Sequence, residues 1–300
     1  MTIKVDLRSD TVTKPTPGML DAMITAKVGD DVLGEDPTVG QLENKLAALF
    51  DMEAGLFCPS GTMTNQIAIK CHTQPMDEVI CDQRSHVYRY EVGGIAYNSI
   101  ASVRLLDGVN GILTPELIES EINEANIHYP SSTLVVLENT VNKGGGACYT
   151  LSQIEPIHTL CNIKGLKLHL DGARVFNALV ATGNHSKDYG RYFDSISVCL
   201  SKGLGAPVGS VLLGSKEMIK KASKIRKALG GGMRQAGFLA AAGIYALDHH
   251  VDRLAIDHQH AIELSAALKQ AVYVGSVLPV ETNIVVFEVA KGFKASTIVR

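Results

Sequence analysis

The 300-residue sequence contains no apolar run of the roughly 20 residues that a membrane-spanning helix requires, so an integral membrane protein is not expected. Its opening segment, MTIKVDLRSDTV, lacks the apolar core of a secretory signal peptide, which favours a cytoplasmic protein. A net charge of −3 provides no basic footprint, so nucleic acid is not an expected partner. Neither repeats nor low-complexity stretches interrupt the chain.

Cysteine spacing gives no sign of a metal site. None of the six cysteines stands in a CxxC pair or in another metal-binding spacing, and most of them lie in apolar segments. We therefore expect reduced core thiols and no metal centre. The six are Cys58, Cys71, Cys81, Cys148, Cys161 and Cys199.

Strands and helices alternate over residues 54–214, which predicts a mostly parallel sheet covered by helices on both faces. A long helix, about 251–270, and a strand, ETNIVVFEV, follow and depart from the alternation of strands and helices seen over residues 54–214. This change indicates a smaller C-terminal α/β domain. The expected division is an N-terminal arm (1–16), a large domain (17–250) and a small domain (251–300).

Two apolar segments end on residues of opposite charge. KLHLDGAR delivers Asp171 and FDSISVCLSK delivers Lys202, 31 residues later, which is about one βαβ crossover. Ligands bind beyond the carboxyl ends of such strands. Either motif alone is equally consistent with a turn or a helix cap. Together they predict a pyridine-aldehyde cofactor, with the carboxylate holding the ring nitrogen protonated and the lysine forming a Schiff base.

Ser60, Gly61 and Thr62 follow a short apolar strand and open a helix. Free amides at a helix N-terminus, next to small residues, favour an anion such as phosphate. The segment lacks the longer glycine pattern of a nucleotide-binding loop, and alone it is weak, because such turns are common.

His86 follows the strand Val79–Cys81, and Glu91 comes five residues later. A lone histidine is more often structural or exposed. Here its position after a strand predicts a neutral ring that lies against a planar cofactor. In the N-terminal arm, Ser9 and Asp10 could be no more than solvated polar residues.

Lys227 and Arg234 flank a triple-glycine loop. Their helix could be an ordinary solvated surface helix. The pair also suits an anion contact across a subunit boundary.

Jointly, several stretches make the chain resemble the low-specificity L-threonine aldolases, which are fold type I (aspartate-aminotransferase-like) pyridoxal-phosphate enzymes. The resemblance implies a seven-stranded-type large domain, a smaller α/β domain and pyridoxal 5'-phosphate as cofactor. It extends to about residue 255. The stretches are DLRSDTVTKPT, GDDVLGEDPT, FCPSGTMTNQIA, HVYRYEVGG, LENT, HLDGARVFNA, SVCLSKGLGAPVGSVL and RKALGGGMRQAG.

The resemblance implies a role for each matching residue of the cofactor site. Lys202 would form the Schiff base, and Asp171 would hold the pyridine nitrogen. Gly61 and Thr62 would bind the phosphate, and His86 would stack on the ring.

The resemblance also assigns the substrate site. Ser9 and Arg174 would bind the substrate carboxylate, with Arg174 also beside the cofactor, and His128 would lie near the substrate side chain. Lys227 and Arg234 would come from a neighbouring subunit of a homotetramer whose active sites are shared.

The implied reaction is retro-aldol cleavage of L-threonine or L-allo-threonine to glycine and acetaldehyde, in threonine catabolism and glycine biosynthesis. His86 or His128, through a water ordered by Glu91, is the expected base. Three alternatives remain open: a β-eliminating lyase, an amino-acid racemase, or a non-catalytic cofactor-binding regulatory protein. Because the chain stops at Arg300 inside KASTIVR, where a helix is expected to begin, we also expect the natural protein to be longer.

Overall fold

A computed structural model describes residues 5–298, so residues 1–4 of the expected arm and 299–300 of the expected small domain lie outside it. Its strands are β1 (Ala54–Cys58), β2 (Asp77–Asp82), β3 (Ser102–Leu106), β4 (Ser131–Glu138), β5 (Lys167–Gly172), β6 (Ser195–Cys199), β7 (Ser210–Gly214), β8 (Val274–Val277) and β9 (Phe287–Val289).

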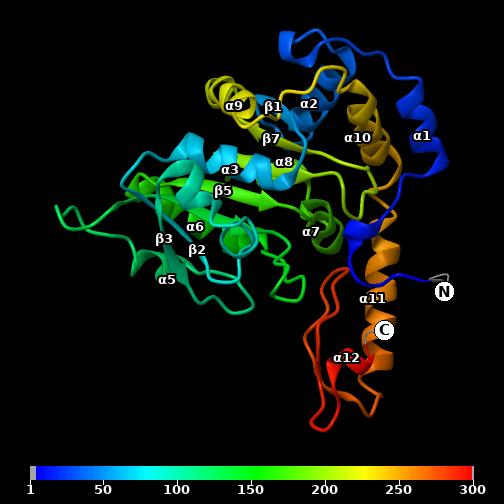
Figure 1. Cartoon of the computed structure of the whole chain (residues 1–300). Coiled ribbons are helices and arrows are strands. Elements are labelled where there is room, and N and C mark those ends of the chain that lie inside the picture. Colours follow the sequence, from blue (N-terminus) through cyan, green and yellow to red (C-terminus); the bar gives the residue numbers. More distant parts are fainter. Residues whose placement is uncertain (1–4, 299–300) are drawn as a thin grey trace.

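Helices cover the sheet on both faces (Figure 1). The α-helices are α1 (Pro17–Ile24), α2 (Pro37–Phe50), α3 (Gly61–His72), α4 (His86–Arg89), α5 (Pro115–Glu119), α6 (Leu151–Lys164), α7 (Val175–Thr182), α8 (Ser186–Gly190), α9 (Lys216–Ala228), α10 (Gly237–His249), α11 (Leu254–Leu268) and α12 (Ala295–Ile298). Single turns of other helix types are η1 (Asp10–Val12), η2 (Asp31–Leu33) and η3 (Ile95–Ser99).

The main sheet confirms the predicted α/β class. Within the described residues it has seven strands in the order β1-β7-β6-β5-β4-β2-β3. β7 alone is antiparallel to its neighbours, β1 and β6. The connection from β6 to β7 spans only residues 200–209, and such a short, glycine-rich link permits an antiparallel return but not a helical crossover.

The core lies in two layers, one on each side of the sheet. The larger layer packs α2, α6, α7 and α10 against one face, with Leu42, Ile157 and Phe176 among its buried residues. The other face is covered mainly by α3 and α9, where Ile67 and Ile219 are buried. Because both faces are covered, the central strands are apolar along most of their length.

The C-terminal part differs in detail from the sequence expectation. The predicted long helix is α11, and β9 covers only the end of the expected strand ETNIVVFEV. The preceding residues contact the loop after β4 and the N-terminal segment instead: Thr282 Oγ1 donates to the Gly146 carbonyl, and Asn283 Nδ2 donates to Asp10 Oδ2. Side-chain contacts therefore replace strand pairing there. Across residues 5–298, every helix is too short or too polar to cross a membrane.

Candidate active site

The carboxyl ends of β4, β5 and β6 form the floor of the candidate site. Asp171 on β5 is the strand-register partner of Glu138 on β4. β6 pairs with β5 in parallel on the other side, and Lys202 follows its last residue, Cys199, by three positions. The predicted adjacency of the two strands that deliver Asp171 and Lys202 is confirmed.

Asp171 is a buried carboxylate bound by neutral donors. Its side chain is 2% exposed. The Asn65 amide donates to Oδ2 at 2.9 Å, and the Ala173 N–H donates to Oδ1 at 3.1 Å. Among residues 5–298, no lysine or arginine lies within ion-pair distance of it. Since burying a carboxylate without a counter-charge is costly, this position suits a cationic ring nitrogen.

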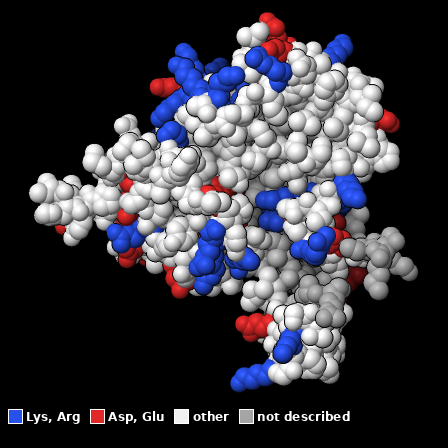
Figure 2. Space-filling view, viewed as in Figure 1, with Lys and Arg blue, Asp and Glu red and all other residues white. Residues whose placement is uncertain are grey.

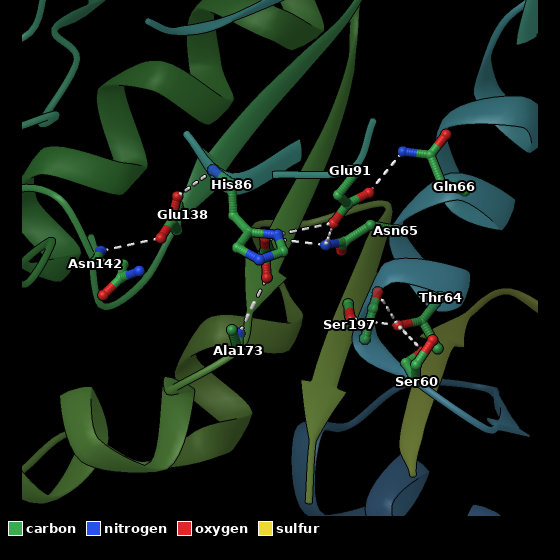
Figure 3. Close-up of polar contacts among 12 residues, drawn as sticks. Ser60, Thr64, Asn65, Gln66, His86, Glu91, Glu138, Asn142, Ala173 and Ser197 are labelled. Carbon is green, nitrogen blue, oxygen red and sulfur yellow. Dashed lines mark hydrogen bonds and ion pairs between the residues drawn. The ribbon is translucent and has the colours of Figure 1, made fainter. Parts of the chain in front are cut away.

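His86 begins α4 and pairs with Glu91, and Figure 3 shows its ring directed toward Glu91 and Asn65. His86 Nδ1 lies 3.0 Å from Glu91 Oε1, which also accepts from Asn65 at 3.0 Å. The hydrogen bond to Glu91 raises the pKa of His86. The His86 backbone N–H donates to Glu138 at 2.8 Å, and burial raises the pKa of Glu138 to about 7.

The potential ligand atoms of His86, Glu91 and Asp171 lie within 4.8 Å of one another, a spacing that a metal site would also have. The Asn65 amide, however, donates to both carboxylates, so a hydrogen-bond donor lies between the two groups that a cation would have to share. This arrangement suits an organic ring better than a metal ion. The sequence expectation of no metal stays a prediction.

The N-terminus of α3, formed by Ser60, Gly61 and Thr62, has the composition of a phosphate-binding site, here called the phosphate cup. Ser60 is its N-cap, and the Ser60 hydroxyl accepts from the Met63 N–H at 3.2 Å. Gly61 and Thr62 occupy the first turn, where N–H groups lack intrahelical partners. The Ser210 hydroxyl is buried without a partner in the described part of the chain and would lie 3.4 Å from a Cβ on Gly61. An unsatisfied hydroxyl next to Gly61, whose turn has free amides, fits an anionic group.

Arg174 has a partner that the sequence analysis did not foresee. Its Nε and Nη2 donate to the two oxygens of Asp10 at 2.8 and 2.7 Å, and this ion pair is almost fully buried. Burial raises the pKa of Asp10, but the bonds from Arg174 and the charge of Lys202 outweigh burial and lower it overall. A bidentate grip of Arg174 on a substrate carboxylate is therefore not available in this arrangement. Only Nη1 has no hydrogen-bond partner among residues 5–298.

The N-terminal arm approaches Lys202. The Thr13 hydroxyl donates to the Lys202 carbonyl at 2.9 Å, so the arm is anchored at the site and is not merely solvated. Ser9 caps the turn η1, where its hydroxyl accepts from the Thr11 N–H at 3.2 Å. Lys202 and Arg174 line one small cavity beside α7.

His128 is not brought to this chain's site. It is exposed in the loop before β4, three residues ahead of Ser131, whereas Glu138 and the site lie at the other end of that strand. An eight-residue strand separates the two ends by roughly 23 Å. Within one chain His128 therefore does not reach the site, because residues that precede a parallel strand lie at its opposite edge, and the expected role near the substrate side chain stays a prediction.

Lys227 and Arg234 also lie outside the group around Asp171. Both are exposed, Lys227 near the end of α9 and Arg234 in the following loop. Arg234 Nη1 lies 2.6 Å from Asp30 Oδ2. Figure 2 shows that lysine and arginine side chains gather over α9. The expected role of the pair at a neighbouring subunit's site stays a prediction.

Three residues of the site were not assigned roles from the sequence. For Asp10 only a solvated position was considered, as one of the possibilities for the arm, and neither Asn65 nor Glu138 was singled out. Glu138 ends a Val- and Leu-rich strand, and a polar residue at that position is the signal that could have found it. Asn65 carries no such signal, because its contacts come from the packing of α3 on β5.

A buried ion pair fixes β1, which leads into the phosphate cup. Arg226 on α9 contacts Asp31 at 2.9 Å, and both side chains are almost fully buried. Arg226 Nη1 also donates to the Phe57 carbonyl on β1 at 2.6 Å. The guanidinium thus joins α9, the turn η2 and the strand that precedes Ser60.

Replacing Arg226 by methionine should lower the free energy of unfolding by about 3–5 kcal/mol, because the Asp31 carboxylate is left buried and unpaired. Urea unfolding followed by circular dichroism measures it. The matched control is Lys45→Met, which removes a partly exposed partner of Asp248 and should cost no more than about 1 kcal/mol. Equal losses in the two variants would contradict the prediction.

Comparison with known proteins agrees with this geometry. A model of the beta-eliminating lyase family matches residues 6–292. The chain is 43% identical over 293 residues to low-specificity L-threonine aldolase 1 of Arabidopsis thaliana, covering 96% of this chain and 82% of that protein. It is 44% identical over 268 residues to the low specificity L-threonine aldolase of Escherichia coli K12, covering 89% and 80%.

The solved structure of threonine aldolase from Leishmania major matches with a TM-score of 0.83 at 24% identity, over 94% of this chain and 83% of that one. At that identity the match bears on the fold, which it confirms. The family match and the identity to the curated aldolases cover most of the sequence. The chain therefore belongs to the beta-eliminating lyase family and, within it, to the low-specificity L-threonine aldolases.

Proposed function

We propose that this protein cleaves L-threonine and L-allo-threonine between Cα and Cβ, giving glycine and acetaldehyde. The observation that carries the proposal is the placement of a buried carboxylate, Asp171, and the amine-bearing Lys202 beyond the ends of adjacent parallel strands. The kinship with low-specificity L-threonine aldolases supports the same reaction.

The residues present fit pyridoxal 5'-phosphate. Lys202 would carry the cofactor covalently, Asp171 would accept a hydrogen bond from its ring nitrogen, and the amides of Gly61 and Thr62 would hold its phosphate. When bound, the cofactor supplies an electron-withdrawing ring that accepts the electron pair freed at Cα. The two hydrogen-bond donors to Asp171 are neutral, which supports this role, because neither of them cancels the charge of the carboxylate.

The substrate carboxylate would bind Ser9 and the Nη1 group of Arg174. Asp10 holds the other two guanidinium nitrogens that face it, so it fixes the orientation of Arg174 while leaving one donor for the substrate. A fixed carboxylate determines which bond to Cα stands perpendicular to the cofactor ring, and only that bond is weakened.

His86 would take the β-hydroxyl proton as the Cα–Cβ bond breaks. A base must be neutral before it accepts a proton, and the partner carboxylate of Glu91 stabilises the cationic ring that results. Glu91 is itself held by Asn65 and Gln66, so the ring orientation does not depend on His86 alone.

This role predicts a pH shift. Because Glu91 raises the pKa of His86, the Glu91→Gln variant should reach its plateau of kcat/KM at lower pH than wild type. The sign follows from the loss of a contact that favours imidazolium. The measurement is kcat/KM for L-allo-threonine against pH, with Glu78→Gln as control, since Glu78 is buried beside Arg104 at the far end of β2. An unchanged profile for Glu91→Gln would remove His86 as the base.

The assembly and domain assignments are part of the same proposal. A homotetramer would place Lys227 and Arg234 of one chain at the site of another, which their exposure allows. A role for His128 at a neighbouring chain's site is compatible with its exposed loop. The division into an arm (1–16), a large domain (17–250) and a small domain (251–300), and a cytoplasmic location, are proposed alongside.

Product analysis decides among the enzyme activities. Purified protein with added cofactor is incubated separately with L-allo-threonine and L-threonine, and glycine and acetaldehyde are quantified. Equal amounts of the two products are expected. A 2-oxo acid with ammonia would indicate β-elimination, and an inverted amino acid would indicate racemisation. No product from either substrate would favour a non-catalytic cofactor-binding protein.

A further inference from the structure

A line of hydrogen bonds runs beneath α3 and ends at Asp171. Asn65 Oδ1 lies 3.2 Å from His169 Nε2. His169 Nδ1 lies 2.8 Å from the hydroxyl of Ser195, and the same hydroxyl lies 2.8 Å from His72 Nε2. Together with the Asn65 contact to Asp171, four side chains connect the end of α3 to the carboxylate of the site.

The direction of every bond in this line follows from the carboxylates at one of its ends. Asn65 must turn its amide nitrogen toward Asp171 and Glu91, because two carboxylates cannot accept from an oxygen. Asn65 Oδ1 then needs a donor, so His169 carries its proton on Nε2. His169 Nδ1 must accept from the Ser195 hydroxyl, and that hydroxyl in turn accepts from His72.

Burial keeps the members of the line neutral. His169 is fully buried, and burial lowers the pKa of His169 to about 3 and that of His72 to about 4. The line therefore brings no positive charge to Asp171. An amide cannot pass a proton along as a hydroxyl or imidazole can, so Asn65 also prevents the line from conducting protons to the surface. What remains is orientation, with every donor aligned toward the carboxylates.

The positions of β5, β6 and α3 determine where the His169 side chain lies. It lies two residues before Asp171 on β5, so both side chains face α3. Ser195 is its register partner on β6, and Asn65 and His72 stand on α3 itself. A rigid sheet and one helix thus hold all members, and through Asn65 they contact two carboxylates of the site, Asp171 and Glu91.

We infer that His169, acting through Asn65, is a positioning residue that fixes the Asp171 carboxylate against the cofactor's ring nitrogen. The inference rests on the proposed role of Asp171. Without the His169 donor, Asn65 Oδ1 is buried and unpaired, which costs free energy. Rotation of the Asn65 amide away from Asp171 then becomes more favourable. The Asp171 carboxylate then loses its fixed orientation, and the proton affinity of the cofactor's ring nitrogen falls.

The test compares His169→Leu with His169→Gln. Leucine fills much of the space without a donor, whereas glutamine can still donate to Asn65 Oδ1 and accept from Ser195. For His169→Leu we expect kcat to fall roughly ten- to a hundredfold, as when a partner that orients a functional ligand is removed. His169→Gln should recover most of that loss. Ile80→Val, in a fully buried position on β2, is the control for packing damage alone.

A second measurement distinguishes positioning of Asp171 from a purely structural role of His169. It is the nitrogen-15 NMR shift of the cofactor ring, in enzyme loaded with ring-labelled pyridoxal phosphate, and loss of packing alone would leave this shift unchanged. At neutral pH, wild type, His169→Gln and Ile80→Val should show the protonated-ring position, and His169→Leu should move toward the unprotonated one. If His169→Leu does not fold, the same measurements are made on Ser195→Ala. That variant removes the hydroxyl that donates to His169 Nδ1 and keeps the imidazole ring.

A His169→Leu enzyme with the wild-type ring shift and no more activity loss than Ile80→Val overturns the inference. Asp171→Ala separates this outcome from failure of the proposed function. If Asp171→Ala is severely impaired while His169→Leu is not, only the positioning role is lost. If Asp171→Ala is itself near normal, the assignment of Asp171 has failed first.

Discussion

Replacing Lys202 by alanine should abolish threonine cleavage and remove the yellow colour of covalently held cofactor. Lys202 is the lysine that follows β6 and lines the small cavity with Arg174, so we expect no other described lysine to replace it. Loss of a covalent catalytic group commonly lowers kcat by a thousandfold or more, and a drop of at least about that size is expected here. Acetaldehyde release and the absorbance spectrum of the purified protein measure both effects.

The matched control is Lys45→Ala, which removes a lysine from α2 that pairs with Asp248 on the molecular surface. It should keep the colour and the wild-type rate. Colour retained in Lys202→Ala would place the attachment on another amine. A colourless wild-type protein that cleaves threonine at full rate would refute the cofactor assignment as a whole.

Asp171→Ala should leave cofactor attachment possible and lower kcat by two to three orders of magnitude. A carboxylate about 4 Å from a cation, at an effective dielectric constant near 20, contributes roughly 4 kcal/mol, or close to a thousandfold in proton affinity. Without it the ring nitrogen is less often protonated, and the ring accepts electrons less well. Single-turnover kinetics with L-allo-threonine separate this effect from weaker binding.

Two further variants isolate the charge of Asp171. Asp171→Asn keeps the shape and part of the hydrogen bonding, so it should be impaired nearly as much as Asp171→Ala if the charge is what matters. Asp82→Asn is the control for a buried carboxylate, because Asp82 ends β2 and accepts from the Gly108 N–H. Near-normal kcat in Asp171→Ala would assign the ring nitrogen to another partner.

Local sequence signals located the elements that form the candidate site. The apolar segments that end on Asp171 and Lys202 are adjacent parallel strands, and Ser60 caps the helix that Gly61 begins. These features are encoded within a few residues each: an apolar run, a polar residue at its end, and a small residue or a cap at a helix start. A parallel sheet then brings strand ends to one edge whatever the intervening helices contain.

Contacts between distant segments were not readable in the same way. The ion pair of Asp10 with Arg174 joins residues 164 positions apart, and the bond from Asn283 to Asp10 spans 273. His128 matched the family's pattern, yet its position before β4 puts it at the wrong edge of the sheet within one chain.

The sequence by itself determined the α/β class, the order of the elements, the family and the residues at the strand ends, because each depends on local patterns or on motifs that stay close together in the chain. Only the tertiary structure decided which partners those residues have. In the structure Arg174 pairs with Asp10, and His128 lies away from its own chain's site. A line of hydrogen bonds leads to Asp171 through four side chains: His72, Ser195, His169 and Asn65. Side-chain hydrogen bonds depend on distances of a few tenths of an ångström between packed elements, and no local pattern carries that information.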